Sequence, residues 1–305
     1  MVQKAKVLNP WFTEDNVKDS FREWGQALTL ENLENWLEPY ADNIKDCNKA
    51  VGIVMAGNIP LVGFHDLLSV ILSGNRAVVK MSSSDNLLMG KIIQLLQHFS
   101  PDMKELIKVV PKLTEIEAII ATGSNNTSRY FDYYFGKYPC IIRKNRNSVA
   151  VITGDESSDE LKGLGRDIFQ YFGLGCRSVA KLYVPKGYDL DNIFGAIFSY
   201  KDIVNHNKYA NNFDYNKALY MMNQDDLLEN GFILFKKDKT LTSPIATMFY
   251  EEYEDLEMLK KELAEKESEI QCIVSKEDVP FGKSQSPHLW DYADGIDTME
   301  FLVNL

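Results

Sequence analysis

Two polar motifs in this chain could together carry out acyl transfer through sulfur. One is a cysteine among glycines, Gly-Leu-Gly-Cys-Arg-Ser at residues 173–178, between a helical run and the apolar segment 180–184. The other is Gly57–Pro60, which puts the amide of Asn58 at a strand-to-helix turn. The reaction needs a nucleophile and a donor for the oxyanion that forms. Cys176 and Asn58 supply both, although a single cysteine is more often a small core residue.

The composition predicts a globular protein with an acidic surface. Of the 305 residues, 45% are hydrophobic and 25% are charged, so the chain is long enough for two domains with sizeable cores. The net charge of −11 disfavours nucleic acid and anionic membranes as partners. An anionic cofactor stays compatible with that charge, because backbone N–H groups at helix starts can bind phosphate.

The cysteines predict neither a zinc site nor a disulfide scaffold. They are far apart and form no CxxC pair, which suits a reducing compartment. The N-terminus lacks the apolar core of a signal peptide, and the longest apolar stretch, 50–74, contains polar residues that no membrane helix buries without partners. We therefore expect a cytoplasmic protein with no membrane span and no metal. The cysteines are Cys47, Cys140, Cys176 and Cys272.

The first half of the chain alternates short β-branched runs with helices. Two amphipathic helices are expected in the first fifty residues, from apolar side chains at helical spacing. Strands that alternate with helices indicate a doubly wound, mostly parallel sheet. The expected strands are 51–55, 77–80, 106–110, 118–121, 140–142 and 149–152, and the expected helices are 60–72, 86–98 and one after residue 124.

A second α/β domain is expected after the acidic, serine-containing segment Asp155–Asp159. The predicted domains are therefore residues 1–155 and 156–305. The charged run 254–267 predicts a helix with a solvated face and leucines turned inward. The other expected elements are helices 159–172 and 190–200 and strands 181–184, 232–235, 246–250 and 271–274.

Polar residues follow three of the predicted strands of the first sheet. They are Asn58, then Lys80 with Ser82 and Ser83, and then Gly123–Ser124. An open parallel sheet binds ligands beyond the carboxyl ends of its strands, so these residues are candidates for a cofactor site. The GxGxxG fingerprint of an ordinary Rossmann dehydrogenase is absent. Ser124 suits a pyrophosphate at a helix start and equally suits a plain N-cap.

Several segments, in order, resemble the aldehyde dehydrogenase superfamily over about residues 50–285. Val51–Pro60 is similar to its strand ending in Trp-Asn-Phe-Pro, and Ser73–Lys80 to its Ala-Gly-Asn-Thr-Val-Val-Leu-Lys. Ala121–Ser124 resembles its Phe-Thr-Gly-Ser turn, residues 173–184 its nucleophile segment, and Val279–Gly282 its Pro-Phe-Gly. Each match alone has little specificity, whereas the ordered set is specific.

The resemblance implies an aldehyde-dehydrogenase-like fold and a role for each motif. It makes residues 1–155 the N-terminal helices and NAD(P)-binding domain, and residues 156–305 the catalytic thioacyl domain, with a C-terminal segment that returns to the first domain. It makes Cys176 the nucleophile and Asn58 a donor to the oxyanion. It places Lys80, with Ser82 and Ser83, at the cofactor ribose and Gly123–Ser124 at the pyrophosphate.

Two departures from that pattern indicate the acyl-CoA reductase branch, which includes the fatty acyl reductase of bacterial luminescence. Arg143 replaces the glutamate that is the hydrolytic base, and Ser83 replaces the acid that holds a ribose 2′-OH. Asn147–Ser148 and the segment 285–292 also look like that branch. The resemblance then implies reduction of an acyl-CoA, or another acyl thioester, to an aldehyde through a cysteine thioacyl intermediate. It implies NADPH as donor, with NADH as the alternative, and a homo-oligomer.

Other interpretations stay open at this stage. His206, in a polar and aromatic stretch, is a candidate to protonate the departing thiolate, and a structural histidine is the competing interpretation. An acyl-phosphate reductase, another aldehyde dehydrogenase activity and a non-catalytic acyl-binding subunit are the alternative functions. If the side chain at position 143 reaches the site, Arg143→Glu is expected to restore some hydrolysis.

Overall fold

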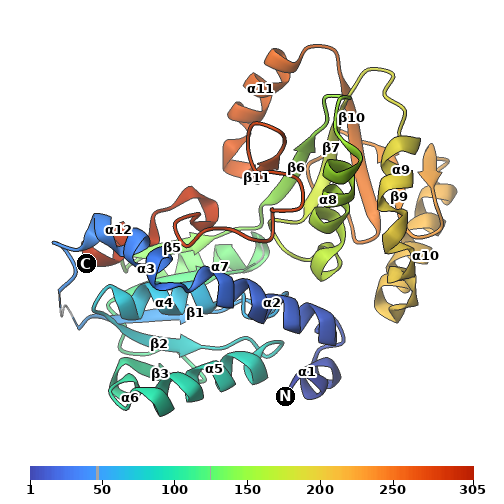
Figure 1. Ribbon diagram of the computed structural model, residues 1–305. Coiled ribbons are helices and arrows are strands. Elements are labelled where there is room, and N and C mark those ends of the chain that lie inside the picture. The colour runs from blue at the N-terminus through green and yellow to red at the C-terminus, as the bar shows by residue number, and fades with distance from the viewer. Residues whose placement is uncertain (46–47, 124) are drawn as a thin grey trace. The chain divides into compact units, whose positions relative to one another are not determined.

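The chain divides into two units, each built on its own sheet (Figure 1). The computed structural model describes residues 1–45, 48–123 and 125–305, without the side chains of 125–128 and 132. The first unit comprises Met1–Asn145 and His288–Leu305, and the second comprises Arg146–Pro287. A parallel sheet covered by helices is what alternating strands and helices predict, and both units contain one.

The first unit contains a five-stranded sheet in the order β3-β2-β1-β4-β5. All neighbouring strands are parallel, and β1 lies between β2 and β4. The chain therefore builds outward from β1 on one side and then crosses to the other side, which is the doubly wound arrangement predicted from the sequence. The strands are β1 (Ala50–Val54), β2 (Arg76–Lys80), β3 (Ile107–Val109), β4 (Ala118–Thr122) and β5 (Cys140–Arg143).

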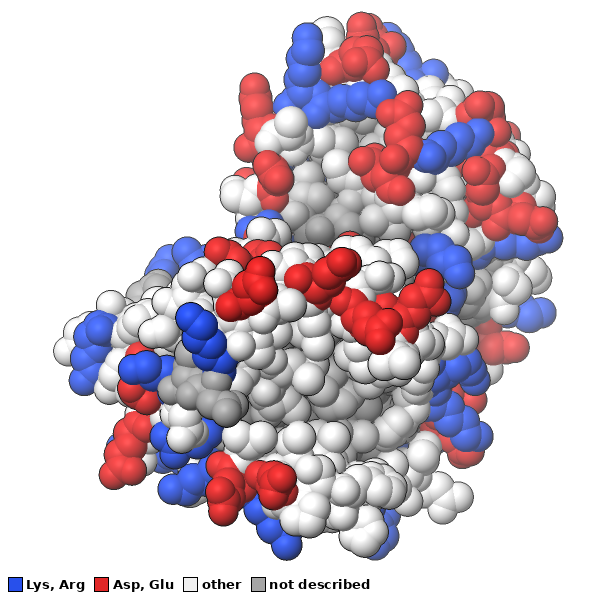
Figure 2. Space-filling view, turned by 60° about the vertical axis from the view of Figure 1, so that its left-hand side comes forward, with Lys and Arg blue, Asp and Glu red and all other residues white. Residues whose placement is uncertain are grey.

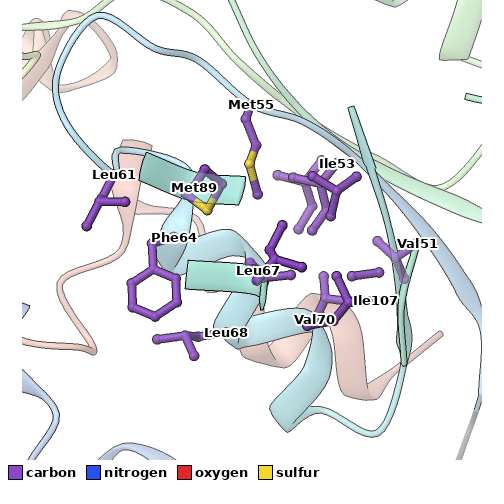
Figure 3. Close-up of a cluster of buried hydrophobic side chains, with 14 of the residues drawn as sticks. Val51, Ile53, Met55, Leu61, Phe64, Leu67, Leu68, Val70, Met89 and Ile107 are labelled. Carbon is purple, nitrogen blue, oxygen red and sulfur yellow. The ribbon is translucent and has the colours of Figure 1, made fainter. Parts of the chain in front are cut away.

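Helices cover both faces of this sheet. On one face Val51 and Ile53 of β1 pack against Leu67 of α4, in the apolar cluster shown in Figure 3. On the other face Val54 and its neighbours pack against Phe131 of α7. The helices of this unit are α1 (Val2–Leu8), α2 (Glu14–Ala27), α3 (Leu30–Leu37), α4 (Phe64–Leu72), α5 (Asn86–Phe99), α6 (Met103–Leu106), α7 (Asn125–Phe135) and α12 (Thr298–Val303).

The end of the chain is part of the first unit's core. Met299 and Leu302 of α12 are buried in the same apolar cluster as β1 and α4. The side-chain amide of Asn75 donates to the carbonyl oxygen of Leu302 at 3.0 Å. Residues 288–305 therefore belong to the first unit, although they lie far in sequence from its other residues.

The second unit contains a six-stranded sheet in the order β11-β6-β7-β10-β9-β8. All neighbouring pairs are parallel except β8 with β9. Leu259 and Leu263 of α11 pack on Val149, Val151 and Tyr183, as the charged helix with an apolar stripe predicted. The strands are β6 (Asn147–Val151), β7 (Val179–Pro185), β8 (Leu227–Glu229), β9 (Leu234–Lys237), β10 (Thr247–Tyr253) and β11 (Ile270–Val274), and the helices are α8 (Ser158–Phe169), α9 (Asp191–Ile197), α10 (Asn207–Met222) and α11 (Leu256–Glu265).

The structure differs from the sequence-based expectation at the boundary between the units. The strand expected at 149–152 was assigned to residues 1–155, but β6 pairs with β7 and β11 in the second sheet. The division therefore falls between Asn145 and Arg146. A strand's apolar pattern shows that it is buried, whereas only its hydrogen-bonded neighbours show to which sheet it belongs.

Charged side chains of both signs intermingle on the surface. On the face that Figure 2 shows, lysine and arginine lie among aspartate and glutamate in many places, while several acidic side chains lie side by side across its middle. In the part of the chain that the structure describes, no helix combines the length and apolar character needed to cross a bilayer.

Candidate active site

Three of the predicted site segments follow neighbouring strands of the first sheet. Asn58 comes after β1, Lys80 ends β2, and Gly123 comes after β4. Val54 pairs with Lys80 across β1 and β2, so the parallel strands end at the same edge. Asn58 and Lys80 are exposed. The structure therefore brings these segments together, as the sequence predicted.

The loops after β1 and β2 lie in direct contact. A Cβ atom on Gly57 would lie 2.5 Å from Oγ of Ser82 and 2.7 Å from its Cβ, so only glycine fits beside Asn58. Ser82 is half-buried in this contact, and Ser83 is exposed in the turn that follows. Ser124, the other predicted cofactor residue, lies outside the described residues.

A buried carboxylate fixes the loop that carries Asn58. The Asp85 side chain accepts the backbone N–H of Leu61 at 2.7 Å, and Leu61 has the left-handed φ of +60°. That conformation is costly for a branched residue and needs such a partner. Burial raises the pKa of Asp85 to about 6, and the bond from Leu61 opposes the rise. Asp85 therefore links the β2 turn to the β1 loop.

The residues at this edge fit a dinucleotide cofactor. Exposed Lys80 offers a cation, and the turn Met81–Ser84 offers hydroxyl groups and no acid. Gly57 keeps the β1 loop close to that turn, and β1 and β4 lie at the point where the strand order reverses. Open parallel sheets bind nucleotides at that point.

In the second unit, Cys176 lies in a turn directly before β7. The turn is closed by the N–H of Ser178, which donates to the carbonyl oxygen of Gly175 at 3.0 Å. Cys176 is exposed. The predicted helix 159–172 ends early, at Phe169, because Tyr171 and Phe172 have φ of 54° and 59°, the left-handed region. Each such residue costs about 1–3 kcal/mol and persists only where its surroundings hold it.

Side chains beneath the turn hold its backbone. The buried hydroxyl of Ser148 in β6 donates to the carbonyl oxygen of Cys176 at 3.0 Å. The same hydroxyl lies 3.0 Å from the sulfur of Cys272 in β11. On the far side of the turn, the amide of Gln285 donates to the hydroxyl of Ser178 at 3.0 Å. The cysteine is therefore positioned by neighbours from two strands and a distant loop.

The predicted Pro-Phe-Gly segment, Val279–Gly282, is the first part of that distant loop. The buried carboxylate of Asp167 in α8 accepts the N–H of Gly282 at 2.6 Å and that of Ser284 at 2.9 Å. Arg177, next to the cysteine, donates to the carbonyl oxygen of Ser284 at 2.7 Å. Burial raises the pKa of Asp167, and the two N–H groups oppose that rise. Arg177 thus joins the cysteine turn to the loop at Ser284.

His206 lies at the N-terminus of α10. Its Nδ1 accepts the backbone N–H of Tyr209 at 3.4 Å, and its ring lies 4.3 Å from that of Phe172, centroid to centroid. Nδ1 is therefore the acceptor that caps the first turn of α10. His206 therefore caps a helix and contacts the strained residue Phe172.

Arg143 is turned into the first unit and not toward solvent. It is buried at the end of β5, and its guanidinium lies 2.7 Å from Asp66 of α4 and donates to the hydroxyl of Thr298 at 2.8 Å. A glutamate there would face Asp66 and lose both partners. We therefore no longer expect Arg143→Glu to restore hydrolysis. The substitution breaks a buried ion pair, which should lower the free energy of unfolding by about 3–5 kcal/mol.

Sequence reasoning missed the two buried acids that hold the site loops. Asp167 interrupts the apolar face of α8, next to Ile168, and Asp85 precedes the apolar start of α5. An aspartate among apolar residues of a helix predicts a buried carboxylate with a hydrogen-bond partner, because an unpaired acid is almost never buried. The partners themselves could not be found from the sequence, because they are backbone groups of Leu61, Gly282 and Ser284.

We expect Asp85 to contribute to the pH dependence of stability. Its pKa is raised from 3.8 to about 6, so between these values the folded state binds more protons than the unfolded state. The free energy of unfolding should fall as pH rises from about 4 to 7, by up to about 3 kcal/mol from this group. Asp85→Asn keeps an acceptor for Leu61, and urea denaturation should show a flatter profile than in the wild type. The exposed control Asp159→Asn should keep the wild-type slope, and an equally steep profile in Asp85→Asn would contradict the assignment.

Comparison with known proteins identifies the family and the fold. The family described as acyl-CoA reductase (LuxC) matches residues 1–193, more than half of the chain. No curated protein gives a significant match. A putative aldehyde dehydrogenase, PutA, from Anabaena variabilis is 12% identical with a TM-score of 0.64, over 92% of this chain and 72% of that one.

Two further aldehyde dehydrogenase structures have the same fold. An NAD-dependent enzyme from Sinorhizobium meliloti is 14% identical with a TM-score of 0.58, over 74% of this chain and 54% of that one. An NAD⁺ complex from Bacillus cereus is 14% identical with a TM-score of 0.57, over 74% and 56%. This chain thus spans little more than half the length of these two, and at such identities the likeness shows the fold alone. The chain belongs to the LuxC family of acyl-CoA reductases, which are oxidoreductases, and it has the fold of the aldehyde dehydrogenases.

Proposed function

We propose that this protein reduces an acyl-CoA thioester to an aldehyde, with NADPH as the electron donor. The observation that carries the proposal is the exposed Cys176 in a strained turn held by Ser148 and Arg177. A cysteine that served only as a core residue would be buried and would not need such support.

In the proposed reaction the thiolate of Cys176 attacks the thioester carbonyl carbon. The carbonyl oxygen becomes an oxyanion, which accepts hydrogen bonds from the backbone N–H of Cys176 and, as the family resemblance implies, from the amide of Asn58. When the oxyanion collapses, the bond to the CoA sulfur breaks, and CoA leaves as a thiolate that takes up a proton. The acyl group is then held on Cys176, which divides one difficult displacement into two easier steps.

The proposed cofactor site is the edge of the first sheet. Lys80, Ser82 and Ser83 would hold the ribose and its 2′-phosphate, and Gly123 with Ser124 would lie at the pyrophosphate. A reduced nicotinamide held by these residues would supply the hydride that the thioacyl carbon accepts. Cys176 then leaves as a thiolate, and the aldehyde is released. Overall, acyl-CoA, NADPH and one proton give aldehyde, CoA and NADP⁺.

The position of Arg143 favours reduction over hydrolysis. Water attack on a thioester needs a group that takes its proton, which contributes about 10²–10⁴-fold. An arginine stays protonated, and this one is buried against Asp66. Hydrolysis of the acyl-enzyme to free acid should therefore be slow compared with its reduction by hydride.

Two other functions remain to be distinguished from this one. An acyl-phosphate reductase would use the same sulfur chemistry with a different leaving group, and a non-catalytic acyl-binding subunit would bind thioesters without consuming NADPH. Following the nicotinamide absorbance with a set of acyl-CoAs and acyl phosphates separates all three. Oxidation of NADPH with acyl-CoA supports the proposal. Oxidation with acyl phosphates but not with acyl-CoA would identify an acyl-phosphate reductase instead.

The nucleophile can be tested without reduced cofactor. An acyl-CoA should label the protein by the mass of one acyl group, and peptide mapping should place it on Cys176. This adduct should release free acid slowly in water and aldehyde rapidly once NADPH is added. Cys176→Ala should abolish the adduct, whereas Cys140→Ala and Cys272→Ala should keep it. Rapid decay of the wild-type adduct to acid would contradict the proposed absence of a base.

The cofactor preference can be tested at Ser83. A glutamate there would repel a 2′-phosphate and accept a free 2′-OH, so Ser83→Glu should shift the ratio of kcat/KM toward NADH by about tenfold or more. Ser84→Glu adds the same charge one residue further along the exposed turn and should shift the ratio less. Equal ratios in the wild type and Ser83→Glu would place the ribose elsewhere.

The role of His206 as proton donor can be separated from its role as a cap. Asparagine is a good N-cap but transfers no proton, so His206→Asn should keep α10 capped, and any fall in the thermal midpoint should report only the lost ring contact with Phe172. If His206 protonates the departing thiolate, the acylation rate should fall by about 10²-fold and its pH profile should change. A rate within threefold of the wild type, with an unchanged pH profile, would leave His206 a cap alone.

A further inference from the structure

A second thiol lies beneath the turn that carries the proposed nucleophile. Cys272 in β11 is half-buried, and its sulfur lies 3.0 Å from the hydroxyl oxygen of Ser148 in β6. The same hydroxyl donates to the carbonyl oxygen of Cys176 at 3.0 Å. The strands β11, β6 and β7 are neighbours in one sheet, and the cysteine turn leads directly into β7 (Figure 1). One small side chain therefore contacts both cysteines within the second unit.

An irregularity in the sheet places Cys272 at this position. The pairing of β11 with β6 shifts between Ile270 and Ile273, as in a β-bulge. Two residues of β11, Gln271 and Cys272, therefore lie opposite the single residue Ser148 of β6. An extra residue bends a strand and changes the direction of a side chain, and such bulges are frequent beside active sites. The bulge accounts for a thiol of β11 that reaches the residue beneath the cysteine turn.

The two thiols differ in their access to solvent. Cys176 is exposed, in a segment between the turn of helix Gln170–Gly173 and the start of β7, whereas Cys272 is half-buried within a strand. Peroxides oxidise an accessible thiolate first, and cysteines that respond to oxidants commonly have a second cysteine beside them. The structure offers this combination: an exposed thiol that is proposed to react as a thiolate, and a sheltered thiol next to it.

We propose that Cys176 and Cys272 form a reversible disulfide that protects the nucleophile when a peroxide is present. This modification site rests on the proposed function, because Cys176 is the residue that the disulfide blocks. A sulfur held in a disulfide cannot attack a thioester, so acyl transfer stops. The bond also prevents further oxidation of Cys176 to the sulfinic acid, which thiols do not reverse.

The oxidation proceeds in two steps. The thiolate of Cys176 attacks hydrogen peroxide, the O–O bond breaks, and Cys176 becomes a sulfenic acid while hydroxide leaves. The sulfur of Cys272 then attacks the sulfenic sulfur, the S–O bond breaks, and a second hydroxide leaves. The hydroxides take up the two thiol protons, so two thiols and one peroxide give one disulfide and two waters. Dithiothreitol supplies two electrons and restores both thiols.

Closure of the disulfide must move the cysteine turn. A disulfide needs the two Cα atoms within about 7 Å of each other. Cys272 is held in the sheet by the pairing of β11 with β6, so the turn with Cys176 is the part that shifts. In that shift the Cys176 carbonyl gives up the hydroxyl of Ser148, which now lies between the two residues.

Mass spectrometry of the whole protein tests the proposal. After a small excess of hydrogen peroxide, the mass of the reduced wild type should fall by two hydrogen atoms. Peptide mapping without a reductant should join the peptide with Cys176 to the peptide with Cys272, and dithiothreitol should restore the original mass. A gain of two or three oxygen atoms on Cys176 would overturn the proposal. A bond from Cys176 to Cys47, to Cys140 or to a second molecule would also overturn it.

Two variants give a matched comparison, because Cys272 and Cys140 are both half-buried in strands, β11 and β5. Each protein is treated with peroxide and then with dithiothreitol, and its acylation by acyl-CoA is compared with its own untreated value. The wild type and Cys140→Ser should recover nearly all acylation. Cys272→Ser should recover about tenfold less, because its Cys176 is oxidised beyond the sulfenic acid. Equal recovery in the two variants would overturn the proposal.

Acylation of the untreated protein separates this inference from the proposed function. If reduced Cys176 takes up the acyl group but peroxide produces no bond to Cys272, the disulfide alone is wrong. If reduced Cys176 takes up no acyl group, the proposed function fails. The mass and the peptide map of the oxidised protein still show in that case whether the two cysteines are joined.

Discussion

Left-handed backbone at residues 171–173 reverses the chain between α8 and β7, and everything at Cys176 depends on it. Tyr171 and Phe172 adopt positive φ without being glycine, so the turn cannot be stable by itself. The structure offsets this cost through distant partners: Ser148 binds the carbonyl of Cys176, and Arg177 binds the loop at Ser284. The strain is therefore part of how the chain presents a sulfur atom to solvent just before the buried strand β7.

The two units use the same device to hold a site loop. In each, a buried carboxylate on or next to a helix accepts backbone N–H groups of a loop from elsewhere in the chain: Asp85 from Leu61, and Asp167 from Gly282 and Ser284. Burial raises the pKa of both acids, while the N–H donors oppose the rise. An apolar residue in either place would leave loop N–H groups without an acceptor, which costs about 1–3 kcal/mol each. The loops of the site are therefore ordered by polar contacts with helices.

Arg143 holds three elements of the first unit together. Its guanidinium joins β5 to α4 through Asp66 and to α12 through Thr298. A buried pair of this kind is costly to break from either side. The same contacts keep the C-terminal helix on the first sheet, so a change at position 143 toward a hydrolytic base would also disturb the fold.

The sequence by itself determined most strands and helices and the order of the motifs, whereas the short antiparallel strand β8 was not predicted. Buried strands and amphipathic helices are local patterns, and the parallel sheet that follows from them places Asn58, Lys80 and Gly123 at one edge. The glycine-rich setting of Cys176 made it the candidate nucleophile. Polar and apolar residues are mixed around all sides of α10, which leaves no such pattern, and α10 was therefore not predicted.

Only the tertiary structure decided which sheet β6 joins and where Arg143 points. The reason is the same in both cases. The pairing of β6 with β11 and the bond from Arg143 to Thr298 join residues far apart in the chain. Such contacts depend on the packing of whole elements, and no single segment carries a signal for them.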